Sequence, residues 1–336
     1  MSAPSMPAAA AATEAAGRVA VHEVAPRDGL QMECRFVPTD DKVAWIDALS
    51  ALGLAKIEVT SFTSPQAIPA LRDAEAVMRR IHRAPGTVYA ALVPNVRGAE
   101  RAIEARTDEL NLVLSASATH NLANLRMTQA QSWRALGEVI RLGQGSGVGI
   151  NVSLSCAFGC PMEGDVDPSA VLGWVARFTD AGVTRVTLCD TTGMADPGQV
   201  LDLCSRVLAR NAQLELTAHF HDTRGLAGAN VMAALQAGVR RFDASLGGIG
   251  GCPYAPGASG NAATEDVVHL LHCLGWSTGV IFEGLEPAGD LLEQLLGHAL
   301  PAAVRRAGPR WRRHPLPADF EATRARALAR EATAAS

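Results

Sequence analysis

The chain has 336 residues, enough for one large domain, and a formal net charge of -4 at pH 7. This balance gives no basic footprint for nucleic acid or an anionic membrane surface, so the expected partner is a small molecule. Its seven cysteines are odd in number and scattered, which favours a reducing, cytoplasmic environment over a secreted disulfide framework, and no apolar run approaches the roughly 18 residues of a membrane span.

The chain begins with an alanine-rich stretch, residues 1–17, that has neither a periodic apolar face nor the basic and hydrophobic regions of a secretory signal. We expect a disordered tail there. Beyond it, short β-branched runs alternate with segments of helical spacing. The expected strands are 19–24, 56–59 (leading into 60–62), 88–93, 109–114, 149–155, 185–189, 214–219 and 241–246. The expected helices are 38–52, 73–81, 97–105, 128–143, 168–181, 197–210, 226–237 and 264–274.

Eight strand–helix units predict a parallel sheet, because a right-handed helical crossover returns each strand beside the last. The count fits an α/β fold of the closed (β/α)8 type, the TIM barrel, over residues 18–280. The glycine-rich stretch 247–260 lacks G-x-G-x-x-G and follows the last strand, which excludes a dinucleotide-binding fold. A further helix from about 286 to 300, within the segment 281–302, is expected to pack on the barrel. Residues 303–336 are expected to form a weakly ordered tail.

The strand over 214–219 ends at two histidines, His219 and His221. Side chains in a strand repeat every two residues, so both imidazoles should face one side while Phe220 faces the other. Two imidazoles in register on a rigid element are a good chelate for a divalent cation. The alternative is that one histidine is a hydrogen-bonded core residue and the other lies in a loop.

Other polar residues fall at the ends of the expected strands, where barrel enzymes carry their chemistry. They are Arg27, Asp28, Glu58, Thr60, Ser61, Asn95, Ser155, Cys156, Asp190 and Thr191. A chain with no site would scatter such residues over helices and surface loops. Their convergence on one face therefore predicts an active site.

Asp28 is the natural anionic partner of the two histidines. Mixed nitrogen and oxygen ligation of this kind suits Mg2+, Mn2+, Co2+ or Zn2+ without choosing among them. The neighbouring Arg27 would lower the pKa of Asp28 and present donors to a substrate oxygen. The pair could instead be a plain surface ion pair, but its place at a strand exit favours the site.

The glycine-rich loop Gly247–Asn261 follows the last strand. Its glycines permit left-handed backbone, as expected for a lid that closes over a ligand. Cys252 lies at its tip. Alone, this thiol would be an ordinary free cysteine.

Six ordered motifs resemble those of a known family. They are Ala25-Pro-Arg-Asp-Gly-Leu-Gln31, Ile57-Glu-Val-Thr-Ser-Phe62, Ser155-Cys-Ala-Phe-Gly-Cys-Pro161, Cys189-Asp-Thr-Thr-Gly193, Ala218-His-Phe-His-Asp-Thr223 and the loop through Gly260-Asn-Ala-Ala-Thr-Glu-Asp266. Together they resemble 3-hydroxy-3-methylglutaryl-CoA lyase, of the metal-dependent TIM-barrel lyase and synthase superfamily. The resemblance covers roughly 19–280, and its Gly-Gly-Cys-Pro-Tyr loop is the motif most specific to the lyase branch.

The resemblance implies a divalent cation, Mg2+ or Mn2+, bound by four residues and supported by Glu58. The four ligands are Asp28, His219, His221 and Asn261. It also implies an acyl-CoA thioester substrate, a homodimer, and a place in leucine degradation or ketone-body formation.

Within the same resemblance, Arg27 contacts the thioester oxygen and Cys252 is the active-site thiol. The substrate contacts taken from these motifs are Arg27, Gln31, Ser61 and Thr191. The implied reaction is a retro-Claisen cleavage, in which the C3 hydroxyl loses its proton, the C2–C3 bond breaks, and a thioester enolate is protonated at C2. The sequence leaves open whether Asp28 or His219 takes the hydroxyl proton.

Some positions depart from the family pattern. Met32 stands where asparagine is common, the C-terminal tail is long, and the loop Ser117–Leu125 is expected to contact substrate and to vary. A lyase for a longer-branched 3-hydroxy-3-alkylglutaryl-CoA is therefore an alternative.

Three other classes compete. A Claisen-type synthase on the same barrel would lack the cysteine loop, and a non-catalytic CoA-binding module would have broken at least one motif position. A Schiff-base aldolase needs a buried lysine. The chain has only Lys42, on an expected helix, and Lys56, at the wrong end of its strand. The arginine bias is typical of a GC-rich bacterial genome.

Overall fold

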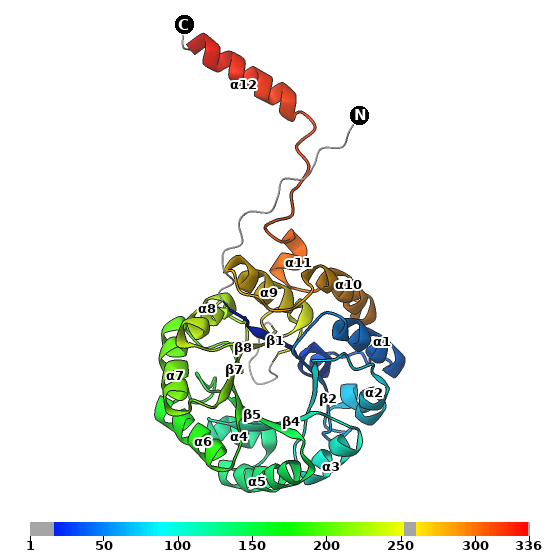
Figure 1. Cartoon of the computed structure of the whole chain (residues 1–336), viewed down its shortest axis with the longest axis vertical. Helices are drawn as coiled ribbons and strands as arrows, with labels where there is room; N and C mark the ends of the chain where they lie inside the picture. Colours follow the sequence, from blue (N-terminus) through cyan, green and yellow to red (C-terminus); the bar gives the residue numbers. More distant parts are fainter. Residues whose placement is uncertain (1–16, 252–259, 335–336) are drawn as a thin grey trace.

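The structure, a computed structural model, describes residues 17–251 and 260–334, and its strands close into a parallel barrel in the order β1 to β8 (Figure 1). The predicted fold class is therefore confirmed. The strands are β1 (Ala20–Glu23), β2 (Lys56–Ser61), β3 (Val88–Leu92), β4 (Glu109–Ser115), β5 (Gly149–Ser155), β6 (Arg185–Asp190), β7 (Glu215–Phe220) and β8 (Arg241–Ala244). All eight lie within or beside the expected ranges.

Helices surround the barrel and alternate with the strands (Figure 1). They are α1 (Thr39–Ser50), α2 (Ala74–Arg80), α3 (Val96–Glu104), α4 (Ala118–Leu125), α5 (Gln129–Ser146), α6 (Pro168–Asp180), α7 (Pro197–Arg210), α8 (Ala227–Ala237), α9 (Thr264–Cys273) and α10 (Leu285–Leu296). Short turns of 3-10 helix are η2 (Leu30–Met32), η3 (Pro69–Leu71), η4 (Leu246–Gly248) and η5 (Phe282–Gly284).

The helix ends follow local chemistry. The α7 helix begins with a capping box, in which the Asp196 side chain accepts from the backbone N–H of Gln199 and the Gln199 side chain accepts from the backbone N–H of Asp196. It also has a proline at its first position, where the missing N–H costs nothing. The α5 helix ends at Gly147, whose φ of 74° is left-handed. Glycine takes this conformation without a Cβ clash, so the helix stops there.

The expectation for residues 117–125 was wrong. A loop was predicted, but the structure has the helix α4, whose N-cap Ser117 accepts a hydrogen bond from the backbone N–H of His120. Asn121 then anchors the helix to the barrel, since its side chain accepts from the backbone N–H of Ser115. The apolar periodicity over eight residues is too short to reveal such a helix.

The barrel interior carries a polar layer in place of a purely apolar one. Asn111 of β4 donates to Glu58 of β2 at 2.7 Å and accepts from Asn151 of β5 at 2.9 Å. Thr187 of β6 belongs to the same polar layer, because its Oγ1 accepts a hydrogen bond from Asn151 Nδ2 at 3.1 Å. The apolar core lies between the strands and the helices, where residues such as Phe242 are fully buried. The strands therefore form a rigid wall whose inner face is available for polar chemistry.

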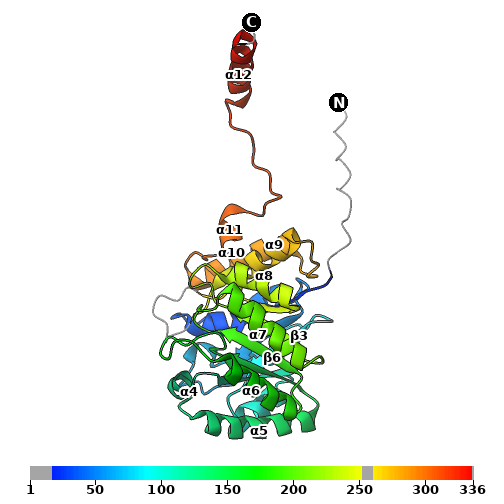
Figure 2. The ribbon, with the colours of Figure 1, turned by 90° about the vertical axis from the view of Figure 1, so that its left-hand side faces the viewer.

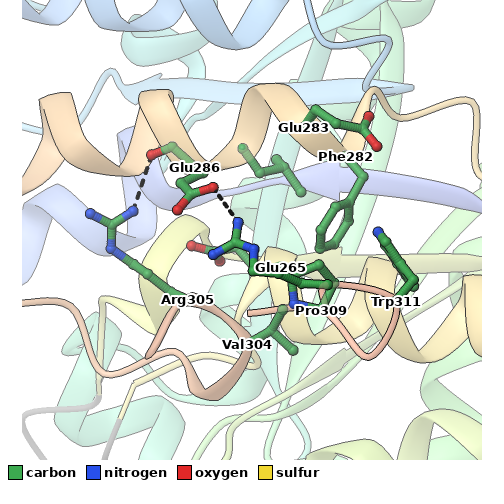
Figure 3. Close-up of a pocket in the computed structure, with 10 residues that line it drawn as sticks. Glu265, Phe282, Glu283, Glu286, Val304, Arg305, Pro309 and Trp311 are labelled. Carbon is green, nitrogen blue, oxygen red and sulfur yellow. Dashed lines mark hydrogen bonds and ion pairs between the residues drawn. The ribbon is translucent and has the colours of Figure 1, made fainter. Parts of the chain in front are cut away.

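The C-terminal segment leaves the barrel. After α10, residues up to Arg312 run over α9 and α10 and enclose a cavity of about 350 Å³, in which Trp311 lies near Phe282 (Figure 3). The helices α11 (Ala303–Ala307) and α12 (Phe320–Ala334) follow, and α12 stands away from the barrel with every residue exposed (Figure 2). A weakly ordered tail was expected over residues 303–336. Among the residues that the structure describes, no helix combines the length and apolar character needed to span a membrane.

Candidate active site

The predicted cation ligands and their carboxylate and arginine neighbours come from β2 and β7, from the exit of β1 and from the segment after β8. Directly after β1, residues Ala25–Gly29 form one turn of π-helix, η1, which carries Arg27 and Asp28. Such turns are rare and recur at functional sites. His219 lies on β7, and His221 just beyond it pairs with Asn261 in an isolated β-bridge. Segments far apart in sequence thus meet at one point.

Asp28, His219 and His221 form a buried cluster whose candidate ligand atoms all lie within 4.8 Å of one another. His219 Nε2 is 3.9 Å from Asp28 Oδ2, and the two imidazole centroids are 5.2 Å apart. Phe220 turns to the other face of the strand and packs on Phe158, with ring centroids 5.9 Å apart. The predicted placement of both histidines on one side is confirmed, and their ligand role stays a prediction.

Asn261 lies against this cluster. Its Nδ2 donates to Asp28 Oδ2 at 2.9 Å and to the carbonyl oxygen of Ile249 at 3.1 Å. Gly250 beside it has φ of 117°, and a Cβ there would come within 2.4 Å of Asn261 Nδ2. Only glycine therefore allows the loop to approach the amide so closely.

Two buried atoms of the cluster, His221 Nδ1 and Asn261 Oδ1, have no hydrogen-bond partner among the described residues. Leaving a buried polar atom unpaired costs about 1–3 kcal/mol. A divalent cation would satisfy both atoms. One carboxylate, two imidazoles and an amide oxygen form a donor set that suits such an ion, so the residues present fit a cation.

Arg27 is fixed by two carboxylates. Its Nη1 donates to Asp28 Oδ1 at 2.6 Å, and its Nε and Nη2 lie 2.7 Å and 2.6 Å from Glu58 Oε2. Asn111 holds the other oxygen of Glu58 at 2.7 Å. Glu58, expected to support the cation ligands, is thus linked to Asp28 through Arg27, and its supporting role stays a prediction.

Electrostatics keep the cluster ready for a cation. Burial alone would raise the pKa of Asp28, but the Arg27 guanidinium, followed by the nearby histidines, holds it below its usual value. Burial, helped by the neighbouring His219, lowers the pKa of His221 to about 4. His221 is therefore neutral at pH 7 and keeps a nitrogen lone pair for ligation.

Sequence reasoning missed Asp243, which lies on β8 behind the cluster. One carboxylate oxygen is 3.0 Å from His22 Nδ1 and the other is 3.4 Å from His219 Nδ1. Burial alone would raise the pKa of Asp243, but the hydrogen bonds from His219 and His22 lower it well below its usual value. Its sequence context, Phe242-Asp243-Ala244, looks like any strand interior. The partners of Asp243 become apparent only when the strands are closed into a barrel.

The residues predicted to contact substrate divide into two groups. Arg27 and Gln31 face the cluster, and Gln31 Nε2 donates to Asp28 Oδ1 at 2.8 Å. The hydroxyls of Ser61 and Thr191 are engaged locally: Ser61 Oγ lies 2.7 Å from Thr63 Oγ1, and Thr191 Oγ1 accepts from the backbone N–H of Cys156. Cys252 lies outside the described residues.

Asn95, expected at the rim beyond β3, caps a helix there. Asn95 caps α3 by accepting from the backbone N–H of Gly98 at 2.9 Å. A hollow of about 540 Å³ at the ends of β2 and β3 is lined in part by Asn95 and Phe62.

Neither lysine reaches the mouth. Lys42 on α1 donates to Asp73 at 2.6 Å, and Lys56 at the start of β2 pairs with Glu109 at the start of β4. Both are tied into ion pairs away from the cluster.

A closed parallel barrel with a buried carboxylate–imidazole cluster and an arginine at its mouth is the arrangement of a cation-assisted α/β-barrel enzyme. The chain matches the HMGL-like family over residues 18–292 and belongs to it. It is 45% identical over 285 residues to the hydroxymethylglutaryl-CoA lyase YngG of Bacillus subtilis, a match that covers 85% of this chain and 95% of that protein.

Two further relatives bear on substrate. The (R)-citramalyl-CoA lyase of Chloroflexus aurantiacus is 41% identical over 301 residues, covering 87% of this chain and 95% of that protein. An A. baumannii HMG-CoA lyase structure, in complex with coenzyme A and 3-methylmalate, matches with a TM-score of 0.85 and 48% identity, covering 89% of this chain and 98% of that chain. The resemblance seen in the sequence is confirmed, and the chain is a carbon–carbon lyase.

Proposed function

We propose that this protein cleaves 3-hydroxy-3-methylglutaryl-CoA to acetyl-CoA and acetoacetate, with a divalent cation held by Asp28, His219, His221 and Asn261. One observation carries the proposal: the cation cluster and the Arg27 guanidinium share the Asp28 carboxylate, whose two oxygens face His219 and Arg27 respectively. A substrate oxygen at the cluster would therefore lie within reach of two positive centres. Thioester enolate formation needs this arrangement.

Two N–H groups of Arg27 remain for the substrate. A guanidinium carries five N–H groups, and the contacts with Asp28 and Glu58 engage three of them. The remaining two are free to meet the thioester oxygen. Because Glu58 is itself held by Asn111, the guanidinium plane is fixed before substrate arrives. Stabilising the developing negative charge then needs little reorganisation.

The cleavage follows from these positions. A bound divalent cation supplies Lewis-acid stabilisation of negatively charged oxygen. The C3 hydroxyl gives its proton to Asp28, because His219 Nδ1 faces Asp243 and its Nε2 is a proposed cation ligand; the C2–C3 bond breaks, and C3 becomes the ketone of acetoacetate. The electron pair left on C2 is delocalised into the thioester that Arg27 faces. Cys252 returns a proton to C2; the family motif supports this role.

The test is a substrate panel with purified protein and Mg2+ or Mn2+, with the acyl-CoA and keto-acid products identified by mass spectrometry. The panel contains 3-hydroxy-3-methylglutaryl-CoA, a longer-branched 3-hydroxy-3-alkylglutaryl-CoA and (R)-citramalyl-CoA. Acetyl-CoA and acetoacetate from the first substrate support the proposal. Cleavage restricted to either of the others reassigns the substrate, and condensation of acetyl-CoA with a 2-oxo acid without any cleavage makes the protein a synthase.

A matched control variant shows whether a loss of activity comes from the site or from the preparation of a variant protein. Arg206→Ala removes an ion pair with Asp202 on the outer helix α7, which contains none of the cluster residues. Its activity should equal that of the unaltered protein. Asp28→Asn should lose cleavage and cation binding together.

The proposal also covers the cellular location, the oligomeric state and the pathway of the protein. We place the protein in the cytoplasm of a bacterium, as a homodimer acting in leucine degradation or ketone-body formation, with no nucleic-acid or membrane partner. The family match and the acidic balance of the chain support this. Light scattering coupled to size-exclusion chromatography tests the dimer, and a monomer at micromolar concentration would contradict it.

A further inference from the structure

Three residues lie abreast at one level of the barrel. In the strand register, His219 of β7 is opposite Asp243 of β8, and Asp243 is opposite His22 of β1. Residues opposite one another on neighbouring parallel strands point the same way, so the three side chains form a row inside the barrel. All three are nearly buried, with side chains no more than 13% exposed.

The row has a defined hydrogen-bond pattern. Asp243 Oδ1 is 3.0 Å from His22 Nδ1, and Asp243 Oδ2 is 3.4 Å from His219 Nδ1. Since each Nδ1 faces a carboxylate oxygen, each carries its hydrogen there. His219 then presents the lone pair of Nε2 on its far side, where Asp28 Oδ2 lies 3.9 Å away. One carboxylate therefore selects which nitrogen of His219 faces the cluster.

We propose that Asp243 and His22 are positioning residues for the cation site. Asp243 fixes the orientation and tautomer of His219, so that Nε2 is the ligating atom. His22 occupies the second carboxylate oxygen and thereby fixes the plane of Asp243. The inference rests on the cation site of the proposed function, and neither residue touches substrate.

The geometry favours this role over simple packing. A carboxylate buried for packing alone could be satisfied by backbone N–H groups, as Glu265 is by that of Gly247. Both carboxylate oxygens of Asp243 instead face imidazoles, and one of these, that of His219, belongs to the cation cluster. Partners that orient metal-ligating histidines in this way typically change metal affinity by about 10–100-fold when removed.

The test measures Mn2+ affinity by calorimetry and by electron paramagnetic resonance, together with the visible spectrum of the Co2+-loaded protein. Asp243→Asn presents a donor to one of the two Nδ1–H groups, so we expect Mn2+ affinity to fall about 10–100-fold and the Co2+ bands to shift. His22→Leu should cause a smaller fall in the same direction. His22→Asn should restore affinity, because its amide nitrogen lies near the position of the imidazole Nδ1.

The control is Asp73→Asn. It also removes the charge of a largely buried carboxylate paired with a cationic side chain, Lys42, but outside the strands, between α1 and the start of α2. A loss of melting temperature with unchanged Mn2+ affinity is expected there. If Asp243→Asn does not fold, the comparison of His22→Leu with His22→Asn decides the question.

Failure of this inference is distinguishable from failure of the proposed function. An unaltered protein that binds Mn2+ but cleaves none of the thioesters refutes the function, while the variant titrations still decide the positioning role. Unchanged Mn2+ affinity and Co2+ spectrum in Asp243→Asn and in His22→Leu would overturn the positioning role, whatever the activity.

Discussion

Glu23 at the end of β1 is a fully buried carboxyl group that ties together the two strands closing the barrel. Its Oε1 accepts from the backbone N–H groups of Ala25 and Leu246, both at 2.9 Å, and its Oε2 accepts from the Thr264 hydroxyl at 2.8 Å. Burial nevertheless raises the pKa of Glu23 to about 8, because these hydrogen bonds offset only part of the desolvation. We predict that this group makes the stability of the protein depend on pH.

The sign and size follow from proton linkage. In the unfolded chain Glu23 titrates near 4.5, and in the folded chain near 8. Between these values the folded state holds one proton more, so the free energy of unfolding falls as pH rises. The stabilisation is fully present below the unfolded pKa and is lost through the folded one. At about 1.4 kcal/mol per tenfold change in proton affinity, the loss amounts to roughly 5 kcal/mol. Glu265, whose pKa burial raises to about 7, adds a contribution of the same sign.

The measurement is urea unfolding followed by circular dichroism between pH 5 and pH 8.5. Glu23→Gln keeps an uncharged group of the same shape, so its stability should decline less than that of the unaltered protein over this range. Groups that do not interact with Glu23 titrate equally in both proteins, so the difference between the two profiles reports Glu23 together with its coupling to Glu265. Glu104→Gln, at a largely exposed carboxylate on α3, is the control and should leave the profile unchanged. Parallel profiles for Glu23→Gln and the unaltered protein would refute the reasoning.

Three further predictions concern the site. His221→Ala removes a ligand and should weaken Mn2+ binding by more than about 100-fold, beyond the range for residues that only orient ligands; retained Mn2+ stoichiometry by elemental analysis would contradict it. Cys252→Ala should lower kcat by about 10²–10⁴-fold, the range for loss of a proton donor, with metal content unchanged; equal metal loss would move Cys252 into the cation shell. Arg27→Lys keeps the charge but not the fork that spans Asp28 and Glu58, so kcat should fall about 10²–10³-fold; steady-state kinetics that show only a raised KM would instead assign Arg27 to ground-state binding.

The barrel and its strands could be predicted because they depend on local pattern. Each strand is a short run between turn or helix signals, and helices such as α6 and α7 begin at a proline preceded by a capping aspartate. Strand ends were less accurate. The last strand was expected to reach Leu246, but it ends at Ala244, where the chain turns into η4 so that Leu246 can donate to Glu23.

The candidate ligands could also be predicted, since each lies in a motif at a strand exit. What surrounds them could not. Asp243 is 221 residues from His22, and nothing in the local sequence of either indicates the other. The π-helical turn at Ala25–Gly29 follows a strand and contains a proline, so no helical periodicity marks it. Contacts across the barrel follow from its closure, which the sequence shows only as a count of strands.

Closure also explains why the cluster forms where it does. Asp28 follows β1 and His219 lies on β7, and these strands are not neighbours; β8 lies between them and pairs with both. Asp243 on β8 contacts the strands on either side through His22 and His219, while Glu23 joins the exit of β1 to that of β8. A cation shared by Asp28 and His219 would therefore bridge the seam at which the barrel closes. A ligand that binds only the closed form stabilises it by mass action. The same ion that assists cleavage would thus link the segment after β1 to β7 across the intervening β8, which ties the geometry of the reaction to the integrity of the fold.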